Sequence, residues 1–134
     1  MTARRLAAAL FALCVLPLGA CGGISSPSSN TTDQFSGTLQ LGGTNSHTFS
    51  VQKTGEFEIR LTALAPAANT IVGVAFGQVF NSACEILPGY QNNFAQLNRS
   101  ALAGPISKGT YCAVVYDSGR LTQVVTYTLA VSRP

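Results

Sequence analysis

The 134-residue sequence contains no tryptophan, a single histidine and only five acidic residues. These few, scattered side chains leave no cluster of the kind that binds zinc or calcium, so we expect no metal and no cofactor. Basic residues are scattered too, which excludes the basic stripe that a nucleic-acid backbone requires. His47 alternates in step with Phe49 and Val51, as residues on one face of a strand do. The sequence spacing identifies no serine and aspartate that would complete a catalytic triad with it. We therefore expect no enzyme, and a hydrolase is the least favoured function class.

After residue 20 the sequence has no apolar run long enough to span a bilayer as a helix. Residues 1–20 have the layout of a secretory signal peptide, with Arg4 and Arg5 before an apolar stretch from Leu6 to Leu18. The stretch ends in Leu-Gly-Ala-Cys, which resembles the lipobox of bacterial lipoproteins, where the cysteine is acylated and becomes the mature N-terminus. The alternative is an ordinary signal peptide cut near residue 20, which leaves Cys21 as a free thiol.

Lipid on Cys21 would anchor the protein, so the membrane is an expected partner. Each buried CH₂ of an acyl chain contributes about 0.8 kcal/mol to the free energy of membrane binding. The residue after Cys21 is Gly22. In lipoproteins of Gram-negative bacteria an aspartate at this position resembles an inner-membrane retention signal, so the absence of that aspartate favours the outer membrane. Residues 21–32 are small and polar and predict a flexible tether with a reach of about 18 Å. The folded domain is predicted over residues 33–134, in an exported protein of the cell envelope.

In the predicted domain, short runs of alternating apolar and polar residues are separated by turn residues. Phe57, Ile59 and Leu61 alternate with polar residues, as in a strand with one wet face. Residues 71–80 predict a central strand whose glycines allow close packing or a bulge. Residues 108–131 predict a β-hairpin whose first strand is covered on both faces, and residues 81–94 predict the longest loop. The fold class is therefore an all-β, antiparallel two-sheet sandwich of seven or eight strands.

Two cysteines remain for the domain once Cys14 leaves with the signal peptide and Cys21 takes lipid. In an exported, oxidising setting Cys84 and Cys112 should form one disulfide, which stabilises the domain by roughly 3 to 4 kcal/mol. The alternative is two separate buried thiols.

Several short motifs resemble the bacterial pre-peptidase C-terminal domain. They are Phe35–Leu39, His47–Val51, Gly55–Phe57, Gly109–Tyr116 and Tyr127–Val131. The resemblance implies a jelly-roll-like sandwich of a kind usually appended to secreted proteases or sugar-active enzymes, where it aids secretion or binds substrate. This sequence departs from that pattern, since no catalytic domain accompanies these motifs. Relatives that bind collagen use an acidic calcium site near the domain start, where only Asp33 precedes Glu56 here, so the resemblance implies no calcium.

Two short segments are candidate ligand sites. Tyr90, Gln91, Asn92 and Asn93 combine an aromatic face with amides that can hydrogen-bond a sugar or a peptide, and Tyr116 with Asp117 forms a second candidate. The alternative is that both are polar turns with a packed tyrosine.

The sequence thus predicts an anchored lipoprotein with a non-catalytic module that binds a glycan or a protein. Its rival is a structural or accessory envelope protein that contacts a protein partner through a sheet edge.

Overall fold

The computed structural model describes residues 29–134 as eight strands in two antiparallel sheets. The strands are β1 (Thr31–Leu39), β2 (Thr44–Val51), β3 (Gly55–Ala65), β4 (Val72–Phe80), β5 (Ala83–Ala95), β6 (Ser100–Ile106), β7 (Gly109–Tyr116) and β8 (Val125–Arg133). The predicted signal peptide, the lipobox, Cys21 and the first part of the tether lie outside the described residues. Within residues 29–134 no helix has the length and apolarity needed to cross a membrane.

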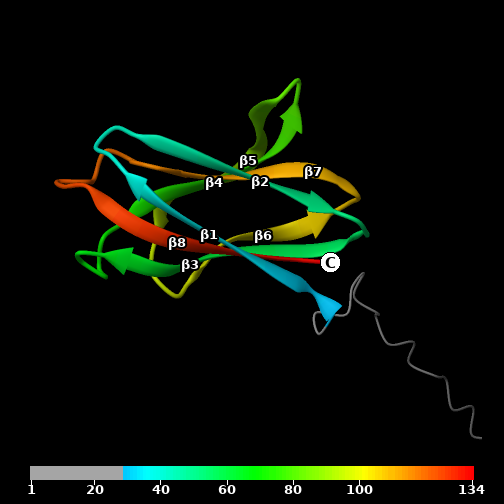
Figure 1. Cartoon of the computed structure of the whole chain (residues 1–134), viewed down its shortest axis with the longest axis horizontal. Coiled ribbons are helices and arrows are strands. Elements are labelled where there is room, and N and C mark those ends of the chain that lie inside the picture. The colour runs from blue at the N-terminus through cyan, green and yellow to red at the C-terminus, as the bar shows by residue number, and fades with distance from the viewer. Residues whose placement is uncertain (1–28) are drawn as a thin grey trace, which may run out of the picture.

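The two sheets lie face to face and are seen nearly edge-on in Figure 1. The first sheet has the strand order β1-β8-β3-β6, and the second has the order β2-β7-β4-β5. This order is that of an eight-stranded jelly roll, in which the chain repeatedly crosses from one sheet to the other. The predicted all-β, jelly-roll-like sandwich is therefore confirmed. The first strand begins at Thr31, two residues before the predicted start of the domain.

The predicted hairpin over residues 108–131 is wrong. β7 pairs with β2 and β4 in the second sheet, whereas β8 pairs with β1 and β3 in the first. The connection over residues 117–124 crosses between the sheets, and it is too long for the two-residue turns that close tight hairpins. The expectation that the first of these runs is covered on both faces is confirmed, because residues 111–115 of β7 are all buried.

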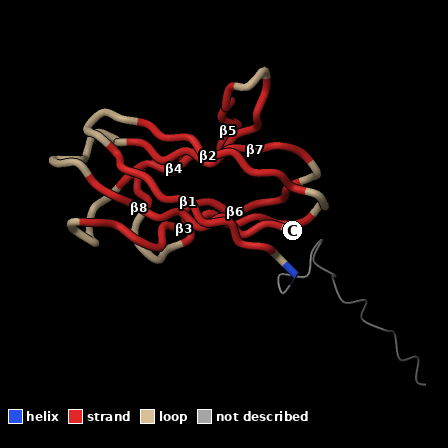
Figure 2. The backbone as a smooth tube through the Cα atoms, viewed as in Figure 1, coloured by secondary structure: helices blue, strands red, loops and turns tan. Residues whose placement is uncertain are grey.

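The long loop predicted over residues 81–94 is wrong as well. This segment forms β5, which pairs with β4 through two register shifts. Four residues, from Leu87 to Tyr90, stand between the paired positions Ile86 and Gln91, opposite Phe76. Their Pro-Gly pair is typical of a turn, and within a strand it produces a bulge instead. Figure 2 shows the β4–β5 turn rising away from the second sheet.

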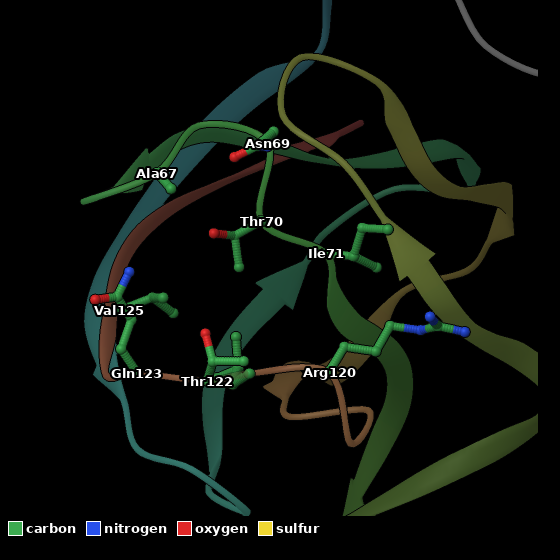
Figure 3. A pocket seen from close by; sticks show the side chains of 9 residues that line it. Ala67, Asn69, Thr70, Ile71, Arg120, Thr122, Gln123 and Val125 are labelled. Atoms are coloured by element: carbon green, nitrogen blue, oxygen red, sulfur yellow. The ribbon is translucent and has the colours of Figure 1, made fainter.

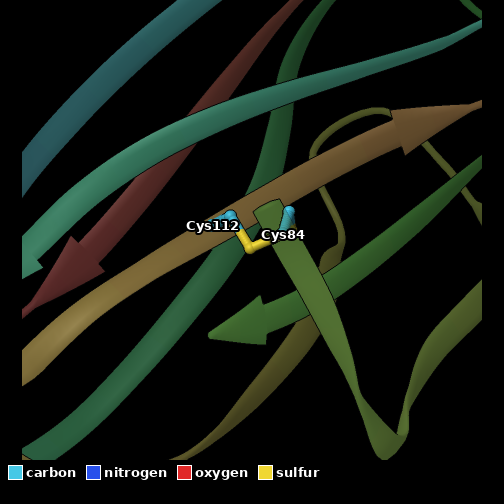
Figure 4. The surroundings of a disulfide bond; sticks show 2 residues. All are labelled: Cys84 and Cys112. Carbon is cyan, nitrogen blue, oxygen red and sulfur yellow. A yellow bond between two sulfur atoms is a disulfide. The ribbon is translucent and has the colours of Figure 1, made fainter. Parts of the chain in front are cut away.

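One disulfide joins Cys84 on β5 to Cys112 on β7, with their Cα atoms 5.9 Å apart, as predicted (Figure 4). The bridge passes over Gly77 of the intervening strand β4. A Cβ atom at Gly77 would lie 2.3 Å from the carbonyl oxygen of Glu85 and 3.1 Å from Sγ of Cys112. Glycine at this position therefore allows β5 to bend across the outer face of the second sheet.

The connections divide between the two ends of the sandwich. Residues 40–43, 66–71, 96–99 and 117–124 link strands at one end, which we name the loop end. Thr31 pairs with Arg133, so β1 begins and β8 finishes at the opposite end, which we name the terminus end. In Figure 1 the loop end lies on the left and the C-terminus on the right. A chain that enters at Thr31 therefore presents the loop end on its far side.

Candidate functional site

The loop end contains a cavity of about 380 Å³ between the connections 66–71 and 117–124. Its lining residues are Ala67, Asn69, Thr70, Ile71, Arg120, Leu121, Thr122, Gln123 and Val125. Thr122 and Gln123 direct a hydroxyl and an amide into this cavity, and Ile71 forms part of its apolar wall (Figure 3). The lining of the cavity is thus mixed, with hydroxyl, amide and guanidinium groups beside apolar side chains.

Arg120 forms part of the rim of this cavity. Its side chain extends past Ile71 (Figure 3), and its guanidinium carbon lies 4.4 Å from the centre of the Phe94 ring. Phe94, at the end of β5, is 58% exposed. Leu41 and Val124, two of the four exposed large apolar side chains of the described chain, also lie in connections of the loop end. Three of the four exposed large apolar side chains of the described chain thus lie at the loop end.

Asp117 fixes the shape of the loop end. One carboxylate oxygen accepts hydrogen bonds from the backbone N–H groups of Gly119, Arg120 and Leu121 at 2.8 to 3.1 Å. The other accepts the N–H of Gly42 at 2.9 Å, so Asp117 joins the 117–124 connection to the β1–β2 turn. The Gly42 hydrogen bond, followed by those from the 119–121 segment, lowers the pKa of the Asp117 carboxyl below its usual value. The predicted ligand residue Asp117 therefore has its oxygens engaged by the backbone.

The structure separates the predicted ligand residues Tyr90 and Asn93. Tyr90 points between the sheets, where its ring lies 5.4 Å from that of Phe76 and 5.9 Å from that of Phe57. Asn93 is exposed on the outer face of the second sheet and accepts a hydrogen bond from the hydroxyl of Tyr116. Asn93 and Tyr116, drawn from the two predicted segments, therefore meet, whereas Tyr90 does not present a free aromatic face.

Asn92 and Gln91 have different surroundings. The Asn92 amide donates to the carbonyl of Ala101 at 2.9 Å, and its oxygen accepts the N–H of Phe94 at 2.8 Å. Asn92 therefore positions the strand end that carries Phe94. Gln91 is exposed opposite Ala75.

His47 lies between the sheets on the side where β1 and β2 form the edges. Its ring stacks on Phe35 at 5.0 Å, and Nε2 forms a 2.7 Å hydrogen bond with the hydroxyl of Tyr127. Burial lowers the pKa of His47 and raises the pKa of Tyr127. The contacts of His47 are thus those of a packed strand residue.

Within residues 29–134 no group of three or more histidine, cysteine, aspartate or glutamate side chains is arranged to hold a metal ion. No protein-family model and no curated protein sequence matches this chain.

Sequence reasoning missed the cavity and the pair formed by Phe94 and Arg120. In the sequence Phe94 ends the predicted loop over residues 81–94, and Arg120 is one of several scattered basic residues. The available signal was the run Asp117-Ser118-Gly119-Arg120, because an aspartate two residues before a glycine is typical of a turn whose carboxylate binds following N–H groups.

Proposed function

We propose that this protein is a non-catalytic binding module whose loop end takes up a ligand, in an exported chain anchored through lipid on Cys21. The observation that carries the proposal is the cavity between residues 66–71 and 117–124, with its converging polar groups and its Phe94–Arg120 rim. The β-sandwich itself is consistent with a non-catalytic module. The resemblance to pre-peptidase C-terminal domains supports the same class of function.

The position of the chain terminus fits this arrangement. β1 begins at the terminus end, and a strand of nine residues spans about 30 Å. A lipid anchor ahead of residue 29 would hold the terminus end toward the membrane and the loop end away from it. The candidate site would then face outward, where a ligand outside the membrane can reach it.

A variant that fills the cavity tests the binding proposal. Thr122→Trp places a large ring where the Thr122 hydroxyl points, and Thr110→Trp, at an exposed position of β7 near the terminus end, is the matched control. We expect glycan and peptide arrays to show ligands that the unaltered chain and Thr110→Trp bind and that Thr122→Trp loses. Array hits that survive Thr122→Trp would place binding elsewhere.

The anchoring proposal has a separate test. Intact mass of the protein purified from membranes should exceed the mass of the chain from Cys21 onward by the mass of the acyl groups. Cys21→Ser should remove that excess and release the protein from the membrane fraction. An unmodified chain in the soluble fraction would overturn the anchor.

A second candidate function is that of an accessory envelope protein that pairs with a partner through β1. This strand forms an edge of the first sheet, and its nine residues pair with β8 without a register shift. A regular edge strand can accept an added strand from another chain. A partner recovered from envelope extracts equally by Thr122→Trp and by the unaltered chain would favour this function.

A further inference from the structure

We infer that the loop end recognises a sugar that carries a carboxylate, the unit of an acidic polysaccharide. This inference rests on the proposed function, because it names the ligand class of the same cavity. Four observations support it. They concern the unused hydrogen-bond donors of Arg120, the contacts that fix its position, the distribution of charge and the lining of the cavity.

Arg120 offers charged donors that the described protein does not use. Within residues 29–134 the arginine ion pairs are Arg60 with Glu58 and Arg133 with Asp33, both at 2.6 Å. No described residue accepts a hydrogen bond from the guanidinium of Arg120, which instead lies over the Phe94 ring. A guanidinium presents a planar fork of donors that matches the two oxygens of a carboxylate. The unused donors of Arg120 can therefore serve a ligand.

Arg120 is also held in place before any ligand arrives. Its backbone N–H donates to the carboxylate of Asp117 at 3.0 Å, and the Phe94 ring supports its side chain. Asn92 in turn accepts the N–H of Phe94. Binding to a preorganised arginine loses less conformational entropy than binding to a free one. These contacts favour a binding role over that of a solvated surface charge.

Charge is unevenly distributed along the sandwich. The connections of the loop end contain Arg99, Arg120 and Asp117, and Asp117 is surrounded by backbone N–H groups. The remaining residues of the described chain comprise four basic and four acidic side chains. The net positive charge of the described chain therefore lies at the loop end. Arg120 is the only charged residue that lines the cavity there, so an anionic group meets no carboxylate in the cavity wall.

The rest of the lining favours a sugar over a peptide. Hydroxyl and amide groups come from Asn69, Thr70, Thr122 and Gln123, and apolar surface comes from Ile71 and its neighbours. A pyranose ring has hydroxyls around its perimeter and C–H groups on its faces, so it can use both kinds of surface. The volume of about 380 Å³ lies near the lower limit for small-ligand sites, as suits one sugar unit at a time. Peptides more often bind along a strand edge, whereas this cavity lies between two connections.

The test measures binding of the full chain to polygalacturonate and to the same polymer after complete methyl esterification, which removes the charge and keeps the sugar. We expect binding to polygalacturonate that weakens with salt and is lost on esterification. Arg120→Gln should weaken it by about tenfold or more, because a charged bidentate contact is lost. Arg60→Gln removes another exposed guanidinium, on the outer face of the first sheet, and should leave binding unchanged. Phe94→Ala should weaken binding less than Arg120→Gln, and Phe94→Tyr should restore it.

Other outcomes overturn the inference and are separable from failure of the proposed function. Equal binding to the esterified polymer would show that the site takes neutral sugars, so the module function would stand and the carboxylate inference would fall. Equal binding to poly-glutamate would show a general contact with anions and would overturn recognition of a sugar. No binding to polygalacturonate, together with array ligands lost in Thr122→Trp, would refute the acidic-sugar class and retain the module. Absence of any ligand in both experiments would refute both proposals.

Discussion

The two sheets of this sandwich are built from different sequence patterns. In the first sheet, Tyr127, Leu129 and Val131 of β8 face the core, while Thr126 and Thr128 face outward. In the second sheet the central strands are buried on both faces, because the outward residues Cys112 and Val114 of β7 are buried too. The chain itself supplies the cover of that outer face. One face of a sheet can therefore become a second, small core without another domain.

Two contacts make that cover. The disulfide passes over Gly77, and the ring of Tyr116 lies over Gly73 so closely that a Cβ there would be 2.3 Å from it. Ala75 and its pair Val114 lie between these two contacts on the sheet. Apolar atoms under such a cover are removed from water, which stabilises the fold in proportion to their area. Variants that remove the cover should therefore destabilise the protein more than variants on the outer face of the first sheet.

The largest effect is expected from loss of the disulfide. Replacing Cys84 and Cys112 together by alanine removes a cross-link between residues 28 positions apart, and the free energy of unfolding should fall by about 3 to 4 kcal/mol. The measurement is urea denaturation followed by intrinsic tyrosine fluorescence. Thr126→Ala, an exposed substitution on the first sheet, should change stability by less than about 1 kcal/mol. Equal effects of the two variants would show that the outer faces do not differ.

The next largest losses of stability are expected from substitutions of two glycines of β4, and the two losses should differ in size. Gly77→Ala should reduce stability by about 1 to 3 kcal/mol, because the added methyl meets the backbone carbonyl of Glu85, which cannot move without shifting β5. Gly73→Ala should cost less, because the half-buried ring of Tyr116 can rotate away from the added methyl. In a double-mutant cycle, Tyr116→Ala should remove the cost of Gly73→Ala and leave that of Gly77→Ala unchanged. Two equal, additive glycine effects would contradict this account.

The contrast between the sheets also explains how far the sequence predicted the fold. Alternation of Phe57, Ile59 and Leu61 is a local signal, and it correctly indicated a strand with one wet face. The apolar residues of β7 correctly indicated cover on both faces. The identity of the cover was not predictable, because it depends on the path of β5 across β4. The pairing of β7 and β8 was predicted wrongly, since adjacency in sequence does not reveal that a connection changes sheets.

The candidate site was predicted less well than the fold. Tyr90 and Asn93 are three residues apart in the sequence, yet one lies between the sheets and the other lies outside them. Strand alternation places residues three apart on opposite faces, but the Pro-Gly pair predicted a loop here, so this alternation was not expected. The cavity forms between two connections that are more than forty residues apart in the chain. Such a site depends on topology, which single residues do not specify.

A smaller effect is expected where the two sheets meet at the side formed by β1 and β2. Tyr127→Phe removes the hydrogen-bond partner of His47 Nε2 and should lower the free energy of unfolding by about 1 kcal/mol.

Burial lowers the folded-state pKa of His47 below its unfolded value of about 6.5, so the unfolded chain binds more protons between these two pKa values. Stability should therefore decline as the pH falls below about 6.5 and should level off below the folded pKa. Urea denaturation from pH 7.5 to pH 5 measures this decline, and His47→Gln should abolish it.

The smallest effect is expected at Asp117, which joins the β1–β2 turn to the connection between β7 and β8 and so links both sheets at the loop end. Asp117→Asn keeps the size of the side chain and one acceptor oxygen, and it should cost about 1 kcal/mol or less, as does weakening of a helix N-cap. Its hydrogen bonds hold the folded pKa of Asp117 below the unfolded value, so its contribution is present above that value and is lost as the pH falls through the folded pKa. The unaltered chain and Asp117→Asn should therefore differ in stability near pH 6 and converge in acid.

Asp117 also holds the backbone of Arg120, so Asp117→Asn should weaken polygalacturonate binding at neutral pH more than it lowers stability. A variant with unchanged binding would show that the side-chain contact with Phe94 suffices to position Arg120.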